Sequence, residues 1–153
     1  MPKIHVSAVP FRKGTGYPPE FDVLSADRLR QRLGEAGLLT DFGINLVRLP
    51  PGSWSGQRHW HSHEDEFVYV IDGELVLIED GLEVSLKADD CAAFPKGIAN
   101  GHHLLNRSNK IAIYLEIGSR NPLDLATCSD VDMMIANSDG CFRRKDGTPY
   151  DHW

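Results

Sequence analysis

The stretch HWHSHEDEFVYVIDG, residues 59–73, carries the strongest local pattern in the chain. It holds three histidines and three consecutive carboxylates, and a run of aromatic and β-branched residues follows them directly. That run, together with ELVLIEDG up to residue 81, predicts a β-hairpin, because strand-forming segments alternate with Asp-Gly turns at 72–73 and 80–81. The sequence therefore places several metal-binding side chains directly before the start of a buried strand.

Strand geometry decides which of these side chains point the same way. Side chains alternate along a strand, so His59 and His61 share one face and Trp60 takes the other. Glu66 has the opposite parity to His61, and it joins that face only if the chain turns between them. The polar segment SHED, residues 62–65, is a suitable turn. We therefore expect two imidazoles and one carboxylate to converge.

A fourth metal ligand is available in GHHLLN, residues 101–106, because a closed barrel brings distant strands opposite each other. His102 and His103 are adjacent and face opposite sides of a strand, so only one of them is expected to bind. Imidazole and carboxylate together suit one divalent ion of Zn, Fe, Mn, Ni or Cu, and ligand types alone do not separate these metals. His63 and His103 are kept as residues that could contact one of the ligands or replace one of them at the metal.

The rest of the chain has the same β character. Short apolar segments such as FGINLVRL (42–49), LEVSLKA (82–88) and IAIYLEIG (111–118) are separated by turn residues. Many short strands with no long helical pattern predict an all-β antiparallel barrel or double-sheet jelly roll. Residues 26–36, ADRLRQRLGEA, fit either a helix or an edge strand, and the nearby glycines favour the strand.

We expect one domain over residues 1–153. Residues 1–40 would form an N-terminal arm with a candidate edge strand, 41–118 the barrel core, and 119–153 a C-terminal extension packed on the barrel. The segment EFVYVI, residues 66–71, is apolar on both faces, which is typical of a strand buried on both sides. Its outer face and the extended arm together predict a homodimer.

The composition of the chain limits the classes of partner that we expect the protein to bind. A net charge of −6 disfavours nucleic acid and anionic membranes as partners. Residues 1–20 contain no long apolar run and no segment is long enough to span a bilayer, so we expect neither a secretory signal nor a membrane partner. Three widely spaced cysteines predict reduced thiols in a cytoplasmic protein. Four arginines could bind a phosphate, but we expect a solvated charged face or ion pairs with the excess carboxylates instead: Arg28, Arg30, Arg32 and Arg48.

Two segments carry a resemblance to a known family. HWHSHEDEFVYVIDG resembles the first motif of the cupin superfamily, G-x5-H-x-H-x3,4-E-x6-G, and FPKGIANGHHLLN, residues 94–106, resembles the second, G-x5-P-x-G-x2-H-x3-N. Ser53 and Asp89 stand where the motifs open with glycine, and the loop before His102 is two residues longer than the pattern. The resemblance covers roughly residues 41–118.

The resemblance implies a fold, a metal and a range of functions. In cupins the histidines and glutamate of these motifs bind a metal, which assigns His59, His61, Glu66 and His102 as ligands; the spacing to Asn106 favours His102 over His103. The chain is also similar to small bacterial single-domain cupins, some provisionally labelled sugar-phosphate (mannose-6-phosphate) isomerases. Cupins host many chemistries. The resemblance thus implies a small-molecule ligand and a metal-dependent isomerase, dioxygenase or lyase, or a non-catalytic binder. No catalytic residue is predicted.

Overall fold

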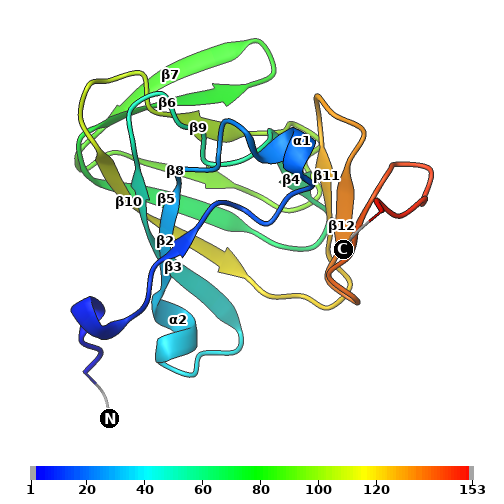
Figure 1. Ribbon diagram of the computed structural model, residues 1–153, viewed down its shortest axis with the longest axis horizontal. Coiled ribbons are helices and arrows are strands. Elements are labelled where there is room, and N and C mark those ends of the chain that lie inside the picture. Colours follow the sequence, from blue (N-terminus) through cyan, green and yellow to red (C-terminus); the bar gives the residue numbers. More distant parts are fainter. Residues whose placement is uncertain (1–2, 152–153) are drawn as a thin grey trace.

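The computed structural model describes residues 3–151 and contains two facing layers of antiparallel strands (Figure 1). The first layer is a six-stranded sheet in the order β1-β2-β3-β10-β5-β8. Its strands are β1 (Arg12–Lys13), β2 (Leu29–Arg32), β3 (Phe42–Leu49), β10 (Ala112–Ser119), β5 (Glu66–Asp72) and β8 (Cys91–Phe94).

The second layer consists of two smaller sheets, β13-β12-β11-β4 and β7-β6-β9. A bridge between His59 and His102 joins them, with backbone N–H···O distances of 3.2 and 2.9 Å. The antiparallel double-sheet jelly roll predicted from the sequence is thus confirmed. The strands are β4 (His59–His61), β6 (Glu74–Glu79), β7 (Leu82–Lys87), β9 (His103–Leu105), β11 (Leu125–Cys128), β12 (Met134–Ala136) and β13 (Phe142–Arg143).

Helices are few and short. The turn at Val6–Ala8 (η1) is a 3-10 helix, and the α-helices are α1 (Pro19–Asp22) and α2 (Leu33–Ala36). Within residues 3–151, no helix has the length and apolar character needed to cross a membrane. Residues 26–36 contain both predicted alternatives in turn, because strand β2 passes directly into α2.

The core lies between the layers, where alternate residues of each strand point inward. In the six-stranded sheet, Val47, Tyr114 and Val70 lie side by side in register, and each is at most 1% exposed. Leu75 of β6 packs against them from the opposite layer. Burying each such large apolar side chain contributes about 1.5–3 kcal/mol. The remaining core residues are Leu49, Val68, Leu77, Leu86, Leu104 and Ala112.

The hairpin prediction for residues 68–81 is wrong in its first half. Strand β5 pairs with β10 and β8, whereas β6 pairs with β7 and β9, so the chain crosses from one layer to the other at Gly73. Gly73 has a φ of +84°, and a Cβ there would lie 3.0 Å from the Ala112 Cα, so only glycine fits this crossing. The hairpin at Asp80-Gly81 is confirmed as the β6–β7 connection.

The outer face of β5 is only partly covered. Its inward residues Val68 and Val70 are buried, as expected, but Phe67 and Tyr69 are half-buried and Ile71 is 44% exposed. The homodimer that this face suggests stays a prediction.

Arg28 follows the second of the two expectations for the arginines, because it is 4% exposed and forms an ion pair with Glu116. Strand β2 pairs with β3 so that Arg30 lies beside Val47 and Leu29 beside Arg48. Alternation then turns Arg28 and Arg30 toward the interior of the barrel. Arg48 points to the opposite face, where its guanidinium lies 4.9 Å from the centre of the Phe11 ring.

Candidate metal centre

Three imidazoles surround one carboxylate inside the barrel. The Nε2 atoms of His59 and His102 lie 3.6 and 2.8 Å from Glu66 Oε2, and His61 Nε2 lies 3.5 Å from Glu66 Oε1. His59 and His61 come from β4, and Glu66 is the first residue of β5. His102 directly precedes β9. The structure thus brings together all four residues that the sequence analysis singled out.

The turn required between His61 and Glu66 is present. Residues 62–65 leave β4 and are fixed to the segment around residues 119–125. Leu125 N–H donates to Ser62 Oγ at 2.8 Å, His63 N–H to Asp124 Oδ1 at 2.8 Å, and Asp65 N–H to Ser119 Oγ at 2.9 Å. Because the turn changes the strand parity, Glu66 faces the same interior as the two histidines of β4.

Two of the histidines have their outer nitrogen occupied by an acceptor. His59 Nδ1 lies 2.8 Å from the Gln57 carbonyl oxygen, and His61 Nδ1 lies 2.6 Å from Asp124 Oδ2. An acceptor at Nδ1 requires the proton there, so in the neutral ring the Nε2 lone pair points toward Glu66. Asp124 is 2% exposed, and its hydrogen bond to Nδ1 fixes the orientation of the His61 ring.

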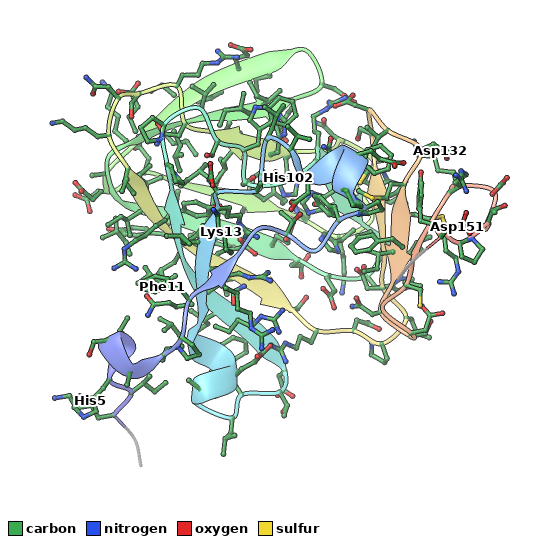
Figure 2. All side chains as sticks on the ribbon, in the orientation of Figure 1. His5, Phe11, Lys13, His102, Asp132 and Asp151 are labelled. Atoms are coloured by element: carbon green, nitrogen blue, oxygen red, sulfur yellow. The ribbon has the colours of Figure 1, made fainter. Side chains whose placement is uncertain are left out.

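His102 and His103 face opposite sides, as alternation requires. The His102 ring is stacked on Phe94, with ring centres 3.5 Å apart and planes within 1°, and it lies inside the molecule (Figure 2). His103 Nδ1 bonds to the Gly56 carbonyl at 3.0 Å, and its ring packs edge-on against Trp54. His63 is exposed and contacts Ser62 Oγ at 2.8 Å. The structure therefore places neither His63 nor His103 in the cluster.

The donor set fits a divalent cation. Glu66 Oε2 is buried and accepts no hydrogen bond of good geometry from the described residues, although two imidazole nitrogens lie near it. A buried carboxylate oxygen this close to two imidazole nitrogens is favourable only if a proton or a metal ion supplies a positive charge among them. Three imidazole nitrogens and a carboxylate are donors that borderline divalent metals accept. This group could hold such an ion, and the ligand atoms of His59, His61 and Glu66 lie within 4.8 Å of one another.

The electrostatics of the cluster agree with this fit. Burial by itself would raise the pKa of Glu66, but the three histidines hold this pKa well below its usual value. Burial lowers the pKa of His61, yet Glu66 and Asp124 outweigh that effect and raise it to about 9. Burial, the largest influence, lowers the pKa of His102. The cluster therefore attracts a positive charge, which is a proton when no metal is present.

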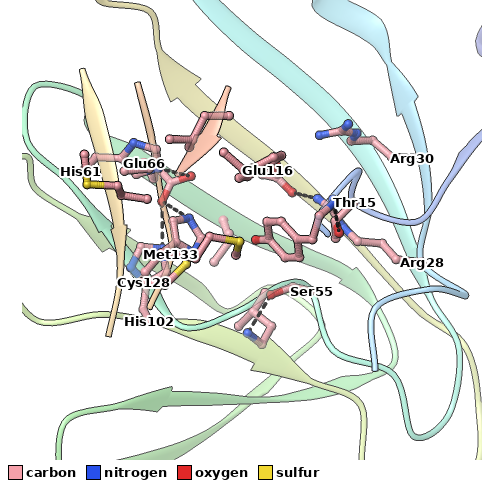
Figure 3. Close-up of a pocket in the computed structure, with 18 of the residues that line it drawn as sticks. Thr15, Arg28, Arg30, Ser55, His61, Glu66, His102, Glu116, Cys128 and Met133 are labelled. Atoms are coloured by element: carbon pink, nitrogen blue, oxygen red, sulfur yellow. Dashed lines mark hydrogen bonds and ion pairs between the residues drawn. The ribbon is translucent and has the colours of Figure 1, made fainter. Parts of the chain in front are cut away.

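The cluster opens into a cavity of about 240 Å³. Figure 3 shows His61, Glu66 and His102 on one side of it and Arg28 and Arg30 on the other, with Glu116 between them and paired with Arg28. The walls between are mainly apolar, and they include Val68, Leu104, Ala126, Cys128, Met133, Met134 and Ile135.

Sequence reasoning missed two features of this site. Asp124 lies in the C-terminal extension, and nothing in its local sequence distinguishes it from a surface carboxylate. Glu116 lies in the predicted strand at residues 111–118, but the sequence alone does not identify which face of that strand is the interior. In both cases only the pairing of distant strands gives the answer.

Comparisons with known proteins agree with this geometry. A family model described as "Cupin domain" matches residues 45–118. The tetracenomycin polyketide synthase protein TcmJ of Streptomyces glaucescens is 35% identical over 66 residues. That match covers 43% of this chain but only 42% of TcmJ, so the chain aligns with less than half of that protein.

Two solved structures match over most of the chain. A sugar phosphate isomerase "from a cupin superfamily", from Silicibacter pomeroyi, is 44% identical with a TM-score of 0.91, covering 97% of this chain and 96% of that one. A "Putative sugar phosphate isomerase" from Acidithiobacillus ferrooxidans is 25% identical with a TM-score of 0.73, covering 84% and 83%. The fold, the two motifs and the extent of these matches lead to one conclusion: this chain belongs to the cupin superfamily.

Proposed function

We propose that this protein is a metal-dependent isomerase of a small phosphorylated sugar. One observation carries the proposal: four metal-binding side chains converge on one side of a cavity that has Arg28, Arg30 and Glu116 on its other side and mainly apolar walls between. The Silicibacter pomeroyi protein, which matches nearly the whole chain, supports the choice of reaction class.

The chain's own residues would position the metal and shield the reaction. His59, His61, Glu66 and His102 would hold the ion, with the first two oriented by Gln57 and Asp124. A divalent ion there would supply Lewis acidity toward a substrate carbonyl oxygen. The apolar walls would exclude water, which strengthens electrostatic interactions within the cavity.

An isomerase also needs a group that carries a proton between neighbouring carbons. Glu116 is suited to this role, because among the described residues lining the cavity it and Glu66 are the only carboxylates. Its side chain is 24% exposed, is paired with Arg28, and has Asn45 Nδ2 3.4 Å from Oε1. We propose that Glu116 takes the proton from the carbon beside the carbonyl and returns it to the former carbonyl carbon. The hydroxyl proton on the first of these carbons passes to the former carbonyl oxygen in the same conversion, so no atom is gained or lost.

The test is turnover of five- and six-carbon aldose phosphates by the protein as purified, by a chelated sample and by Glu116→Gln. We expect aldose-to-ketose conversion that is lost on chelation. Glu116→Gln should lower kcat by about 10²–10⁴-fold without loss of metal, as removal of a general base does. Glu83→Gln, an exposed carboxylate paired with Arg107, is the matched control and should keep full activity.

A non-catalytic binder is the other function that this cavity allows. Thermal stabilisation by a sugar phosphate, with no product formed by metal-loaded protein, would favour the binder and contradict the isomerase.

A further inference from the structure

Besides Glu66 Oε2 in the histidine cluster, the cavity contains three polar side-chain atoms without a hydrogen-bond partner of good geometry in the described part of the chain. Arg28 Nε, Arg30 Nε and Tyr114 Oη are each buried without a hydrogen bond of good geometry to the residues that the structure describes, although the Arg28 guanidinium and the Tyr114 hydroxyl lie close enough to attract each other. All three residues line the cavity that also contains the histidine cluster. Buried donors are normally satisfied, so a group of three in one cavity needs an explanation.

The sheet places these groups next to one another. Arg30 lies beside Val47 of β3, and Val47 lies beside Tyr114 of β10, so Arg30 and Tyr114 share one row across the inner face. Arg28 comes two residues before Arg30 and therefore points to the same face. Figure 3 shows Arg28 and Arg30 across the pocket from His61 and His102.

This side of the cavity also carries an excess of positive charge. Arg28 forms an ion pair with Glu116, and their side chains are 5% and 24% exposed. The Arg30 side chain forms no ion pair and donates no hydrogen bond to the described residues, and the opposite charge lining this cavity that acts on it is also Glu116. Two guanidinium groups therefore share one carboxylate. Arg32, the next arginine along β2, does not line this cavity and is paired with Glu35 at 2.7 Å. Leaving a cation unpaired in a largely enclosed site is unfavourable unless a ligand completes it.

We infer that Arg28, Arg30 and Tyr114 form a binding subsite for an anionic group, a phosphate or a carboxylate, of the ligand that occupies the cavity. The planar guanidinium forks suit the oxygens of either anion. A volume of 240 Å³ corresponds to about eight water molecules, so the complete ligand is small. The inference deepens the proposed function, on which it rests for the role of the histidine side.

The test is calorimetric titration of the full-length protein, as purified, with inorganic phosphate and separately with acetate. Three proteins are compared: wild type, Arg30→Met and Arg107→Met. Arg107 is an exposed arginine paired with Glu83, so its variant matches the change in charge outside the cavity. We expect one of the two anions to bind the wild type, and Arg30→Met to weaken that binding about tenfold or more. Arg107→Met should stay within about twofold of the wild type.

The stronger anion identifies the ligand class, phosphate indicating a phosphorylated ligand and acetate a carboxylate. Arg30→Gln is the second variant if Arg30→Met does not fold by circular dichroism. No binding of either anion, or equal binding by the Arg30 and Arg107 variants, would overturn the inference.

Metal content and a titration of chelated protein separate this inference from the proposed function. Arg30-dependent binding in a protein that holds no metal would support the anion subsite while the proposed isomerase fails. If the protein holds metal but its anion binding does not depend on Arg30, the inference of an anion subsite is overturned and the metal centre is unaffected.

Discussion

The two sides of the cavity differ in how far the chain itself satisfies their polar groups. On the histidine side, the Nδ1 atoms of His59 and His61 are occupied by Gln57 and Asp124. On the arginine side, Arg30 and Tyr114 have buried polar atoms without partners among the described residues. Glu66 Oε2 on the histidine side also lacks a partner of good geometry, but the imidazoles around it are already oriented by the chain. The arginine side has no comparable support for Arg30, so it lacks a component that a ligand can supply.

The largest effect should separate the two adjacent histidines. His102→Ala removes a proposed ligand, so metal affinity should fall by more than the roughly 100-fold typical of losing an outer-shell partner. His103→Ala should leave metal affinity nearly unchanged but lower the unfolding midpoint, because His103 packs on Trp54 and bonds Gly56. Competition with a coloured chelator measures the metal affinity of both variants. Equal metal loss in the two variants would contradict the assignment.

Asp124→Asn tests whether the histidine side depends on its support. The buried carboxylate bonds His61 Nδ1, and we expect metal affinity to fall about 10–100-fold, because an amide holds the imidazole less strongly. Asp130→Asn is the control, since Asp130 is an exposed partner of Arg58. If the two variants bind metal alike, Asp124 has no role in orienting His61.

Gly101→Ala tests the close approach of the strands that carry the histidines. A Cβ at this position would lie 2.0 Å from Ser129 Oγ and 3.3 Å from His59 N. We expect the free energy of unfolding to fall by about 1–3 kcal/mol, which is the usual cost of overpacking. The double variant with Ser129→Gly should recover most of that loss in urea denaturation. Gly43→Ala, which meets only ordinary contacts, should have little effect.

The smallest effect should come from the arginine side. Without ligand, Arg30→Met removes an unsatisfied buried donor, so the free energy of unfolding should stay the same or rise by up to about 1 kcal/mol. Urea denaturation of both proteins in a buffer free of phosphate and carboxylate measures this. A clear loss of stability would indicate that Arg30 is already satisfied by the chain, and the contrast between the two sides would disappear.

Local rules predict the histidine side well. Strand alternation places His59 and His61 together, and the polar turn at residues 62–65 corrects the parity of Glu66, so the three meet as expected. Both rules act within a few residues, which is why the sequence alone suffices. The choice between His102 and His103 came only from the resemblance to the cupin motifs, because alternation excludes one of the two without saying which.

Long-range pairing could not be predicted. His61 and its partner Asp124 are 63 residues apart, and Arg28 and Glu116 are 88 apart. Neither pair has a local pattern, because the order and register of strands bring them together. The same limit explains the wrong hairpin at Asp72-Gly73, where the turn residues were recognised but the change of layer was not.

The metal content of untagged protein, measured by plasma mass spectrometry, tests directly whether the histidine cluster binds a metal ion. The wild type is compared with the double variant His59→Ala, His61→Ala and with His63→Ala, which alters the exposed histidine outside the cluster. We predict about one divalent metal per chain in the wild type and in His63→Ala, and none in the double variant. A wild-type protein that stays empty after incubation with Zn, Fe, Mn, Ni and Cu in turn would contradict the metal centre.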